Sequence, residues 1–347
     1  MQLILEYQPP LRTTQISISE GLVVPPLDRP TVIVIDEKIP KELIAPFLAH
    51  TTAPFFLSGG EGLKSRWMKE KLEDELLRRG LGKDGLLVAV GGGALLDLVG
   101  FVAATYMRGI GLWLVPTTLL AMVDSGIGGK NGINLEGAKN CLGTTYQPEK
   151  IMIETSFLQT LPLLELQNGC IEMIKQAFLG GEAFHIPSLL ARDEATLRRA
   201  VSQNIATKIR IVEASCSRPA IREMLNFGHT IGHALEAMEG FTLSHGAAVA
   251  MGMLAEARLG KLTGEKIAAL EQQIRDTGLP LKISRRYSRE EWQQAFLHDK
   301  KTQKRRPRFV LFDEMGRPLE QNGEYCHEVE SAKLEAALDW LEDHFVA

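Results

Sequence analysis

The sequence has few of the features that mark secreted and membrane proteins. Its four cysteines, Cys141, Cys170, Cys216 and Cys326, lie far apart and form no CxxC pair. This spacing favours free thiols in a reducing compartment over a disulfide framework. No run of about 18 or more apolar residues occurs, and the start of the chain lacks the basic and apolar regions of a signal peptide. We therefore expect a soluble cytoplasmic protein.

The sequence also has little net charge. Its formal charge of −4 over 347 residues provides no electrostatic attraction for nucleic acid or for an acidic membrane. The basic run KKTQKRRPR (300–308) looks like a nucleic-acid patch in isolation, but a solvated surface is the better interpretation of most of it. Apolar residues make up 45% of the chain, an ordinary globular value, and the length predicts two domains.

The pattern of the chain changes near residue 160. Before it, helical patterns such as 65–80 alternate with short apolar runs, namely TVIVID (31–36), GLLVAV (85–90), LWLVP (112–116) and IMIE (151–154). This alternation predicts an α/β domain with a parallel sheet over residues 1–160. Residues 161–347 are patterned mainly as amphipathic helices, with one strand candidate at 308–312 and a closing helix at 332–345. The second domain should therefore be mainly α-helical.

A glycine-rich turn follows one of the expected strands. In GLLVAVGGGALLDLVG, Gly91, Gly92 and Gly93 separate a strand from a helix, and such a turn brings backbone N–H groups close to a pyrophosphate. The three glycines do not have GxGxxG spacing, so a simple tight connection is the alternative. A second turn, SGGEGLK (58–64), and Asp36 at the end of TVIVID favour a dinucleotide site, because an acid there can hold a ribose hydroxyl.

A polar, glycine-dense segment, VDSGIGGKNGINLEGAKN, spans residues 123–140. It contributes Asp124, Lys130, Lys139 and Asn140, and we expect them in one flexible loop. Its glycines would allow the backbone to fold closely around an anionic ligand. A solvated surface loop is the alternative interpretation.

Residues 225–252, LNFGHTIGHALEAMEGFTLSHGAAVAMG, contain three of the eight histidines. His229 and His233 are four residues apart on one face of an expected helix, and His245 opens another. With Glu172 in NGCIEMIKQ they offer nitrogen and oxygen donors that suit Zn²⁺ with one position left open. Spacing alone does not say which histidines bind. Core histidines are the alternative, because no HExxH or CxxC signature fixes the set.

Several ordered motifs together resemble the 3-dehydroquinate synthases of the sugar phosphate cyclase superfamily. They are GGGALLDLVGFVAATYMRG, VPTTLLAMVDSGIGGKNGIN, GAKNCLGTTYQP, EMIK, RxxxNFGHTIGH and SHGAAVAMG, and the resemblance covers residues 30–312. It implies a homodimeric enzyme of the dehydroquinate synthase fold that uses NAD and Zn²⁺ or Co²⁺. The implied reaction converts 3-deoxy-D-arabino-heptulosonate 7-phosphate to 3-dehydroquinate and phosphate, with NAD oxidising the substrate transiently and being regenerated within each turnover.

The resemblance also implies roles for individual residues. The metal ligands would be Glu172, His229 and His245, and the catalytic residues His233, Lys130, Lys175 and Asp124. Substrate would be bound by Arg108 from a partner subunit and by Asn140, Lys208, Arg222, Asn226 and Lys300. NAD would be bound by Asp36, Glu61, Lys64, Gly92, Gly93, Asp97, Thr117, Thr118 and Lys139.

One segment departs from the family pattern. Where the family usually shows DxxExGxR, this chain has SCSRPAIR (215–222), so Arg218 replaces a glutamate thought to take part in proton transfer. A guanidinium does not act as a base near neutral pH, so an electrostatic or structural role is expected for it. The alternatives are another sugar phosphate cyclase, a metal-dependent polyol dehydrogenase that releases NADH, and a scaffold protein without activity.

Overall fold

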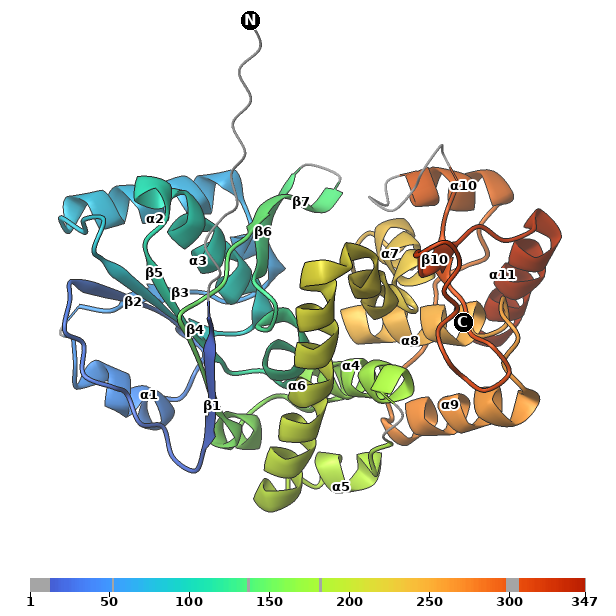
Figure 1. Ribbon diagram of the computed structural model, residues 1–347, viewed down its shortest axis with the longest axis horizontal. Coiled ribbons are helices and arrows are strands. Elements are labelled where there is room, and N and C mark those ends of the chain that lie inside the picture. The colour runs from blue at the N-terminus through green and yellow to red at the C-terminus, as the bar shows by residue number, and fades with distance from the viewer. Residues whose placement is uncertain (1–12, 52, 136–137, 181–182, 298–305, 347) are drawn as a thin grey trace, which may run out of the picture. The chain divides into compact units, whose positions relative to one another are not determined.

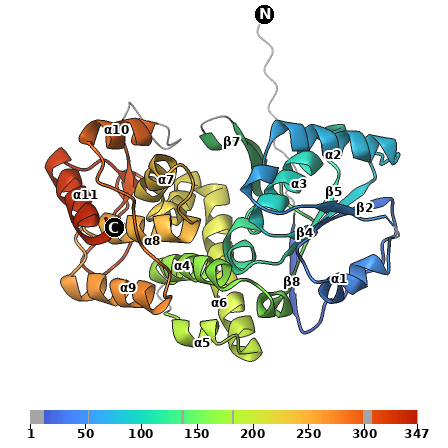
Figure 2. The same ribbon diagram turned by 180° about the vertical axis from the view of Figure 1, so that it is seen from behind.

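The computed structural model describes residues 13–51, 53–135, 138–180, 183–297 and 306–346 (Figures 1 and 2). Two compact units are present. The first comprises Met1–Pro116, Gly128–Leu135 and Leu142–Glu154, and the second comprises Thr117–Ile127, Glu136–Cys141 and Thr155–Ala347. Two short stretches that precede residue 160 thus group with the second unit. Among the described residues, no helix is both long and apolar enough to cross a membrane.

A six-stranded sheet forms the centre of the first unit, and each neighbouring pair of its strands is parallel. The strands in spatial order are β1 (Gln15–Ser19), β8 (Lys150–Glu154), β5 (Gly111–Pro116), β4 (Leu86–Gly91), β2 (Thr31–Asp36) and β3 (Phe55–Leu57). The predicted parallel α/β domain is confirmed. Strand β4 is buried along its whole length, as expected of a central parallel strand covered on both faces.

Helices cover both faces of this sheet. Figure 1 shows α1 (Lys41–Leu48) on one face and α2 (Arg66–Arg78) with α3 (Gly93–Thr105) on the other. Helix α2 begins where the Ser65 side chain accepts a hydrogen bond from the Met68 N–H, and it buries Leu72 and Leu76. Two short 3₁₀ turns, η1 (Glu61–Leu63) and η2 (Tyr106–Arg108), complete the unit's helical elements among the described residues.

The direction of winding reverses between β2 and β4. From β2 the chain moves outward to β3, whereas from β4 it moves the other way through β5 to β8. Ligands of open α/β sheets bind beyond the carboxyl ends of the strands at such a reversal. The reversal therefore gives the glycine-rich turn after β4 the position of a ligand-binding turn.

The segment expected as a flexible loop is instead ordered in its described part, so that prediction was wrong. Residues Ala121–Ser125 form a π-helical turn, η3, and β6 (Lys130–Leu135) pairs with β7 (Ala138–Thr145). The glycines permit close strand pairing: a Cβ on Gly132 would lie 2.5 Å from the Leu142 carbonyl oxygen, and one on Gly143 would lie 2.1 Å from that of Asn131. These glycines allow β6 and β7 to pair closely, and they do not indicate a mobile loop.

The second unit is mainly helical, as predicted. After η4 (Thr155–Gln159) its helices are α4 (Leu163–Gly180), α5 (Ile186–Leu190), α6 (Glu194–Ser217), η5 (Pro219–Asn226), α7 (His229–Met238), α8 (His245–Glu256), α9 (Gly264–Asp276), α10 (Arg289–Leu297) and α11 (Ser331–Phe345). Strands β9 (Phe309–Val310) and β10 (Cys326–His327) form a short antiparallel pair. A core that includes Ile231, Met251, Trp292, Phe309 and Leu341 joins α7, α8, α10, β9 and α11.

Glycines let α7 and α8 pack at very short range. A Cβ on Gly252 would lie 2.0 Å from the Gly228 carbonyl oxygen, and one on Gly232 would lie 3.0 Å from that of Ala248. The pairing of Gly228 with Gly252 and of Gly232 with Ala248 makes the two helices antiparallel. This packing brings the start of each helix beside the later part of the other.

Candidate functional site

Three helices of the second unit bring the predicted metal ligands together. Glu172 lies within α4, His229 is the first residue of α7, and His245 is the first residue of α8. One potential ligand atom from each lies within 4.8 Å of the others. The Glu172 Oε1 atom is 3.6 Å from His229 Nε2 and 3.5 Å from His245 Nε2. Glu172 is fully buried, so its carboxylate requires cationic partners.

Close packing of α4 against α8 sets this geometry. A Cβ on Gly246, the residue after His245, would lie 2.7 Å from the Asn168 Cα atom. Any other residue at position 246 would push α8 away from α4, and His245 away from Glu172. The small residue after the histidine is therefore part of the site.

Both histidines are oriented for metal binding. The Nδ1 atom of His229 lies 3.1 Å from the Phe227 carbonyl oxygen, and that of His245 lies 3.6 Å from Glu236 Oε1. An acceptor at Nδ1 favours the tautomer that protonates this nitrogen, which leaves the Nε2 lone pair facing Glu172. Two imidazoles and one carboxylate in this arrangement fit Zn²⁺ or Co²⁺, with a coordination position left for substrate.

The electrostatics of His245 support the same conclusion. Burial disfavours the charged ring, but the carboxylates of Glu172 and Glu236 outweigh this effect and raise the pKa of His245 to about 10. The surroundings thus favour a positive charge at the imidazole. A divalent cation at Nε2 would supply that charge in place of the proton.

A second cluster of charges lies beside the first. Lys175, one turn after Glu172 on α4, forms an ion pair with it, and its Nζ atom is 4.0 Å from Asp124 Oδ1. The Lys208 Nζ atom of α6 is 2.5 Å from the same Asp124 oxygen. The two lysine side chains are 1% and 5% exposed, so their ammonium groups are held mainly by these carboxylates. The cluster brings together the predicted residues Asp124, Lys175 and Lys208.

The pKa values in this cluster depend on burial and on the pairing. Burial disfavours both ammonium groups; Glu172 and Asp124 nevertheless raise the pKa of Lys175, whereas the pKa of Lys208 remains lowered. Burial also disfavours the Asp124 carboxylate, but Lys208 and Lys175 hold its pKa well below the ordinary range. Asp124 is therefore ionised near neutral pH.

A π-helical turn presents Asp124 to the lysines. The Gly126 N–H donates to the Ala121 carbonyl at 2.9 Å, a five-residue step in place of the usual four. The Gln176 amide of α4 donates to the Val123 carbonyl at 2.9 Å and to Asp124 Oδ1 at 3.3 Å, which fixes the turn. Such π-helical turns are frequent at functional sites.

Replacing Asp124 by Asn should destabilise the protein, because it removes the shared carboxylate from two buried ammonium groups. We expect a loss of about 3 kcal/mol, the usual cost of removing one partner from a buried ion pair. Urea unfolding of the metal-free chain measures this. The matched control is Asp313→Asn, which breaks an exposed pair with Arg317 and should cost under about 1 kcal/mol. Equal effects of the two substitutions would contradict this assignment.

Of the other predicted residues of the second unit, His233, Arg222 and Asn226 lie close to the histidines in space or in sequence. The His233 ring centroid lies 5.3 Å from that of His229 and 6.4 Å from that of His245, outside the three-donor group. Arg222 and Asn226 lie on η5, directly before α7, and burial lowers the pKa of Arg222. Asn140 is exposed on β7 with a positive φ of 55°. Lys300 lies outside the described residues.

The predicted dinucleotide residues of the first unit gather at the reversal of the sheet. Asp36 ends β2, and its Oδ1 atom accepts from the Gly59 N–H at 3.2 Å. Gly92 and Gly93 connect β4 to α3. Asp97 of α3 pairs with Lys64 at 2.7 Å, and the same ammonium is 3.5 Å from Glu61. These residues follow β2, β3 and β4, so the parallel sheet places them at one edge.

The remaining predicted residues are divided between the two units. Thr117, Thr118 and Lys139 belong to the second unit, where Lys139 Nζ is 3.0 Å from Glu236 Oε1. Lys130 begins β6 and Arg108 ends η2 in the first unit, and both are exposed. Met107 and Arg108 have positive φ values of 50° and 61°, a strained conformation for residues with side chains. The three carbonyls of Met107, Arg108 and Gly109 accept from Lys83 Nζ.

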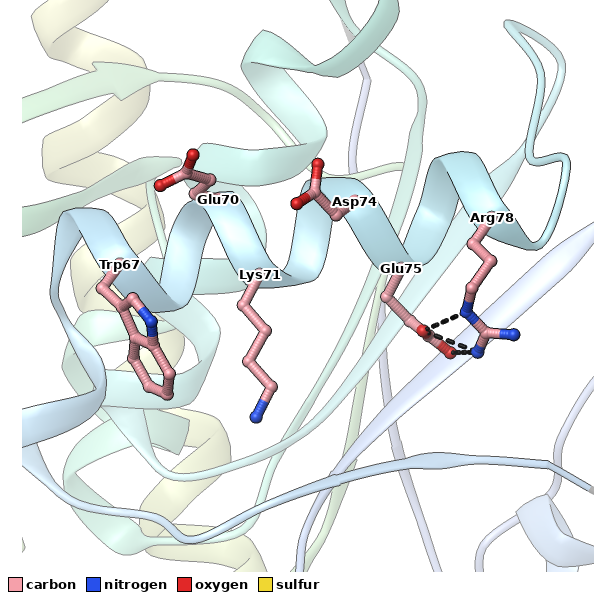
Figure 3. Close-up of a pocket in the computed structure, with 6 residues that line it drawn as sticks. All are labelled: Trp67, Glu70, Lys71, Asp74, Glu75 and Arg78. Atoms are coloured by element: carbon pink, nitrogen blue, oxygen red, sulfur yellow. Dashed lines mark hydrogen bonds and ion pairs between the residues drawn. The ribbon is translucent and has the colours of Figure 1, made fainter.

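A surface pocket on α2 contains none of these residues. Figure 3 shows its lining, which is Trp67, Glu70, Lys71, Asp74, Glu75 and Arg78, all from one helix. Its charged groups are partly paired, as Arg78 and Glu75 show with a contact of 2.6 Å. The pocket therefore carries no part of the site described above.

Sequence reasoning missed three buried polar residues. Gln176 contacts Asp124, whereas Glu236 contacts His245 and Glu256 contacts the first turn of α7. Gln176 and Glu256 are fully buried, and Glu236 is 3% exposed. The available signal was an acidic or amide side chain inside an otherwise apolar helical pattern, as in VAMGMLAEA. Such residues need a buried partner, but the sequence does not identify it.

Comparison with known proteins gives a consistent result across the chain. The model of the 3-dehydroquinate synthase N-terminal region matches residues 54–168, and that of the C-terminal region matches residues 169–302. A 3-dehydroquinate synthase of Pyrococcus abyssi is 38% identical over 277 residues, 79% of this chain and 82% of its own length. One from Chlamydia abortus is 35% identical over 329 residues, 86% of each chain.

Solved structures share the fold at lower sequence identity. A 2-epi-5-epi-valiolone synthase from Streptomyces hygroscopicus, with NAD⁺ and Zn²⁺ bound, has a TM-score of 0.84 and 24% identity, covering 99% of this chain and 100% of its own. A 2-deoxy-scyllo-inosose synthase complexed with carbaglucose-6-phosphate, NAD⁺ and Co²⁺ has a TM-score of 0.80 and 23% identity, covering 90% of each chain. At this identity the likeness establishes the fold.

Proposed function

The chain belongs to the 3-dehydroquinate synthase family, and from this we propose that it converts 3-deoxy-D-arabino-heptulosonate 7-phosphate to 3-dehydroquinate and phosphate. This is the second step of the shikimate pathway, which leads to aromatic amino acids. The observation that carries the proposal is the group of Glu172, His229 and His245 beside the buried Asp124, Lys175 and Lys208. Within one unit, the first three residues would bind a metal and the two lysines would bind an anionic substrate group.

Two bound groups would support the redox chemistry of the reaction: NAD would accept and return a hydride, and Zn²⁺ or Co²⁺ would acidify the substrate hydroxyl that is oxidised. Glu172, His229 and His245 would hold the metal. Asp36, Glu61, Lys64, Gly92, Gly93, Asp97, Thr117, Thr118 and Lys139 would hold NAD. Asp36 at the end of β2 would accept a hydrogen bond from a ribose hydroxyl, and the turn between β4 and α3 would donate N–H groups to the pyrophosphate.

The charged side chains would bind the anionic substrate and stabilise charge as it reacts. Lys208, Arg222 and Lys300 would hold the carboxylate, while Arg108, Lys130, Asn140 and Asn226 would hold the phosphate and hydroxyl groups. Lys175 and Asp124 would line the reacting carbons. With the substrate hydroxyl oxidised to a ketone, the neighbouring C–H would be acidic enough to lose its proton as phosphate leaves. After reduction of the ketone the sugar ring would open, and an internal aldol step would then form the new carbocycle.

Proton transfer is where this chain departs from its family. Arg218 replaces the usual glutamate, is 63% exposed, and lies 3.7 Å from Glu320 through its Nη1 atom. We infer that the substrate phosphate accepts the C–H proton during elimination. His233 would donate or accept a proton at an imidazole nitrogen in another step of the reaction. Arg218 would then have an electrostatic or structural role.

The experiment that tests this function measures phosphate release from the heptulosonate phosphate with NAD and either Zn²⁺ or Co²⁺. We expect release that depends on both added groups and is abolished by chelation. A polyol dehydrogenase or a scaffold protein would release no phosphate. Another sugar phosphate cyclase would release phosphate from a different sugar phosphate but not from this one.

We also propose that the enzyme is a homodimer in which Arg108 serves the site of the partner subunit. Mixing inactive Arg108→Ala chains with inactive Glu172→Ala chains should then restore part of the activity, because a hybrid dimer can assemble one site free of both substitutions. Phosphate release by purified mixed dimers measures the recovery. No recovery in confirmed mixed dimers would mean that Arg108 acts within its own subunit.

A further inference from the structure

Each metal-ligating histidine opens a helix, and each is backed by a buried glutamate from the other helix of the pair. His229 begins α7 beside Glu256, the last residue of α8, while His245 begins α8 beside Glu236 of α7. Because α7 and α8 pack antiparallel, the first residue of each helix lies beside a glutamate of the other. Neither glutamate is one of the three potential ligands.

Glu256 fixes the first turn of α7. Its Oε2 atom accepts from the Gly228 N–H at 2.8 Å, and its Oε1 atom accepts from the Ile231 N–H at 3.3 Å. Gly228 has a φ of 77° and no side chain with which to cap the helix. Glu256 therefore supplies, from a neighbouring helix, the acceptor that an N-cap residue usually provides. The turn that it fixes carries His229.

Glu256 also offsets an electrostatic cost at the site. A helix N-terminus carries roughly half a positive charge, and α7 begins at the residue that would bind a cation. A carboxylate bound to the first N–H groups of that helix cancels much of this charge. Glu256 is fully buried, so water screens its effect little.

Glu236 has the corresponding position beside His245, where it contacts the imidazole directly. Its Oε1 atom faces His245 Nδ1 at 3.6 Å and Lys139 Nζ at 3.0 Å. A carboxylate behind a metal-bound imidazole fixes the ring and increases its basicity.

We propose that Glu236 and Glu256 are positioning residues that hold His245 and His229 for a divalent cation and strengthen its binding. The inference rests on the metal site of the proposed function. It does not depend on which sugar phosphate reacts, because it concerns the affinity of the chain for the metal alone.

The test compares Glu236→Gln and Glu256→Gln, which keep the volume of each side chain and remove its charge. Metal-free chains are titrated with Co²⁺, and binding is followed by the visible absorption of the bound ion. We expect the dissociation constant to rise about 10- to 100-fold in each variant, the usual effect of losing a residue that supports a metal ligand. The Co²⁺ absorption bands should also shift as the imidazoles change orientation.

The matched control is Glu342→Gln, a third buried glutamate. Its Oε1 atom accepts from the Tyr287 N–H at 3.1 Å and from Trp292 Nε1 at 2.9 Å. This substitution should lower the Tm of the metal-free chain, as we also expect of Glu236→Gln and Glu256→Gln. It should leave the Co²⁺ dissociation constant within about twofold, because the partners of Glu342 are not metal ligands. A purely structural role for Glu236 and Glu256 would give the same pattern as Glu342.

Three results would overturn the proposal. Wild-type affinity in both variants would mean that the glutamates do not support the site, and equal weakening by Glu342→Gln would mean that general destabilisation is the cause. A wild-type chain that binds no Co²⁺ would overturn the metal site together with this inference. If the variants weaken Co²⁺ binding but wild type releases no phosphate, the proposed reaction fails and the inference stands.

Discussion

Replacing Glu172 by Gln is expected to abolish both metal binding and turnover. The substitution keeps the shape of the side chain but removes the charge that faces His229, His245 and Lys175. A neutral amide is a poor ligand for Zn²⁺, and the Lys175 ammonium would lose its closest partner. We expect phosphate release to fall at least about a thousandfold, which corresponds to about 4 kcal/mol. Steady-state rates and the bound metal content measure the two effects.

Glu165→Gln is the matched control for this experiment. Glu165 lies in the first turn of the same helix but is exposed, so its replacement should change neither metal content nor rate. A Glu172→Gln variant that retains bound metal and turns over at a rate near that of wild type would contradict the assignment of Glu172.

Replacing His233 by Ala should separate chemistry from metal binding. His233 is one helical turn beyond His229 and close to both ligating rings, yet it is outside the three-donor group. We expect kcat to fall on the order of a hundredfold, or about 2.7 kcal/mol, through loss of proton transfer or charge stabilisation. The metal content should remain that of wild type. Rates measured on metal-loaded, folded protein decide the outcome.

Arg218→Ala supplies the comparison for His233. Because Arg218 is exposed and paired with Glu320, its removal should change kcat by less than about tenfold. A loss from Arg218→Ala as large as that from His233→Ala would show that this arginine has acquired a catalytic role. A His233→Ala variant without its metal would instead make His233 a support of the metal site.

The sequence predicted the sheet well where local patterns determine the structure. Continuous apolar runs fixed the positions of β2 and β4, because strands buried on both faces have no polar positions. The same reasoning failed for residues 123–140. Glycine density looks like a loop, but here Gly132 and Gly143 allow two strands to approach each other. These glycines are required by contact with the partner strand, and local composition does not identify that strand.

The metal set shows a similar limit. Helical spacing favours His229 and His233 as a pair, since they are four residues apart on one face. The structure groups His229 with His245 instead, because α8 returns antiparallel to α7 and α4 packs against α8. Only the family resemblance predicted this choice. Glu236 and Glu256 escaped prediction for the same reason, since their partners lie on the opposite helix of the pair.

The most direct measurement follows phosphate, 3-dehydroquinate and nicotinamide absorbance together during turnover of 3-deoxy-D-arabino-heptulosonate 7-phosphate by the metal-loaded enzyme. A transient oxidation within one active site predicts phosphate and 3-dehydroquinate in equal amounts over many turnovers, with NAD present in catalytic quantity and no NADH accumulating. NADH formed in proportion to the substrate consumed, or turnover without phosphate release, would contradict the proposed function.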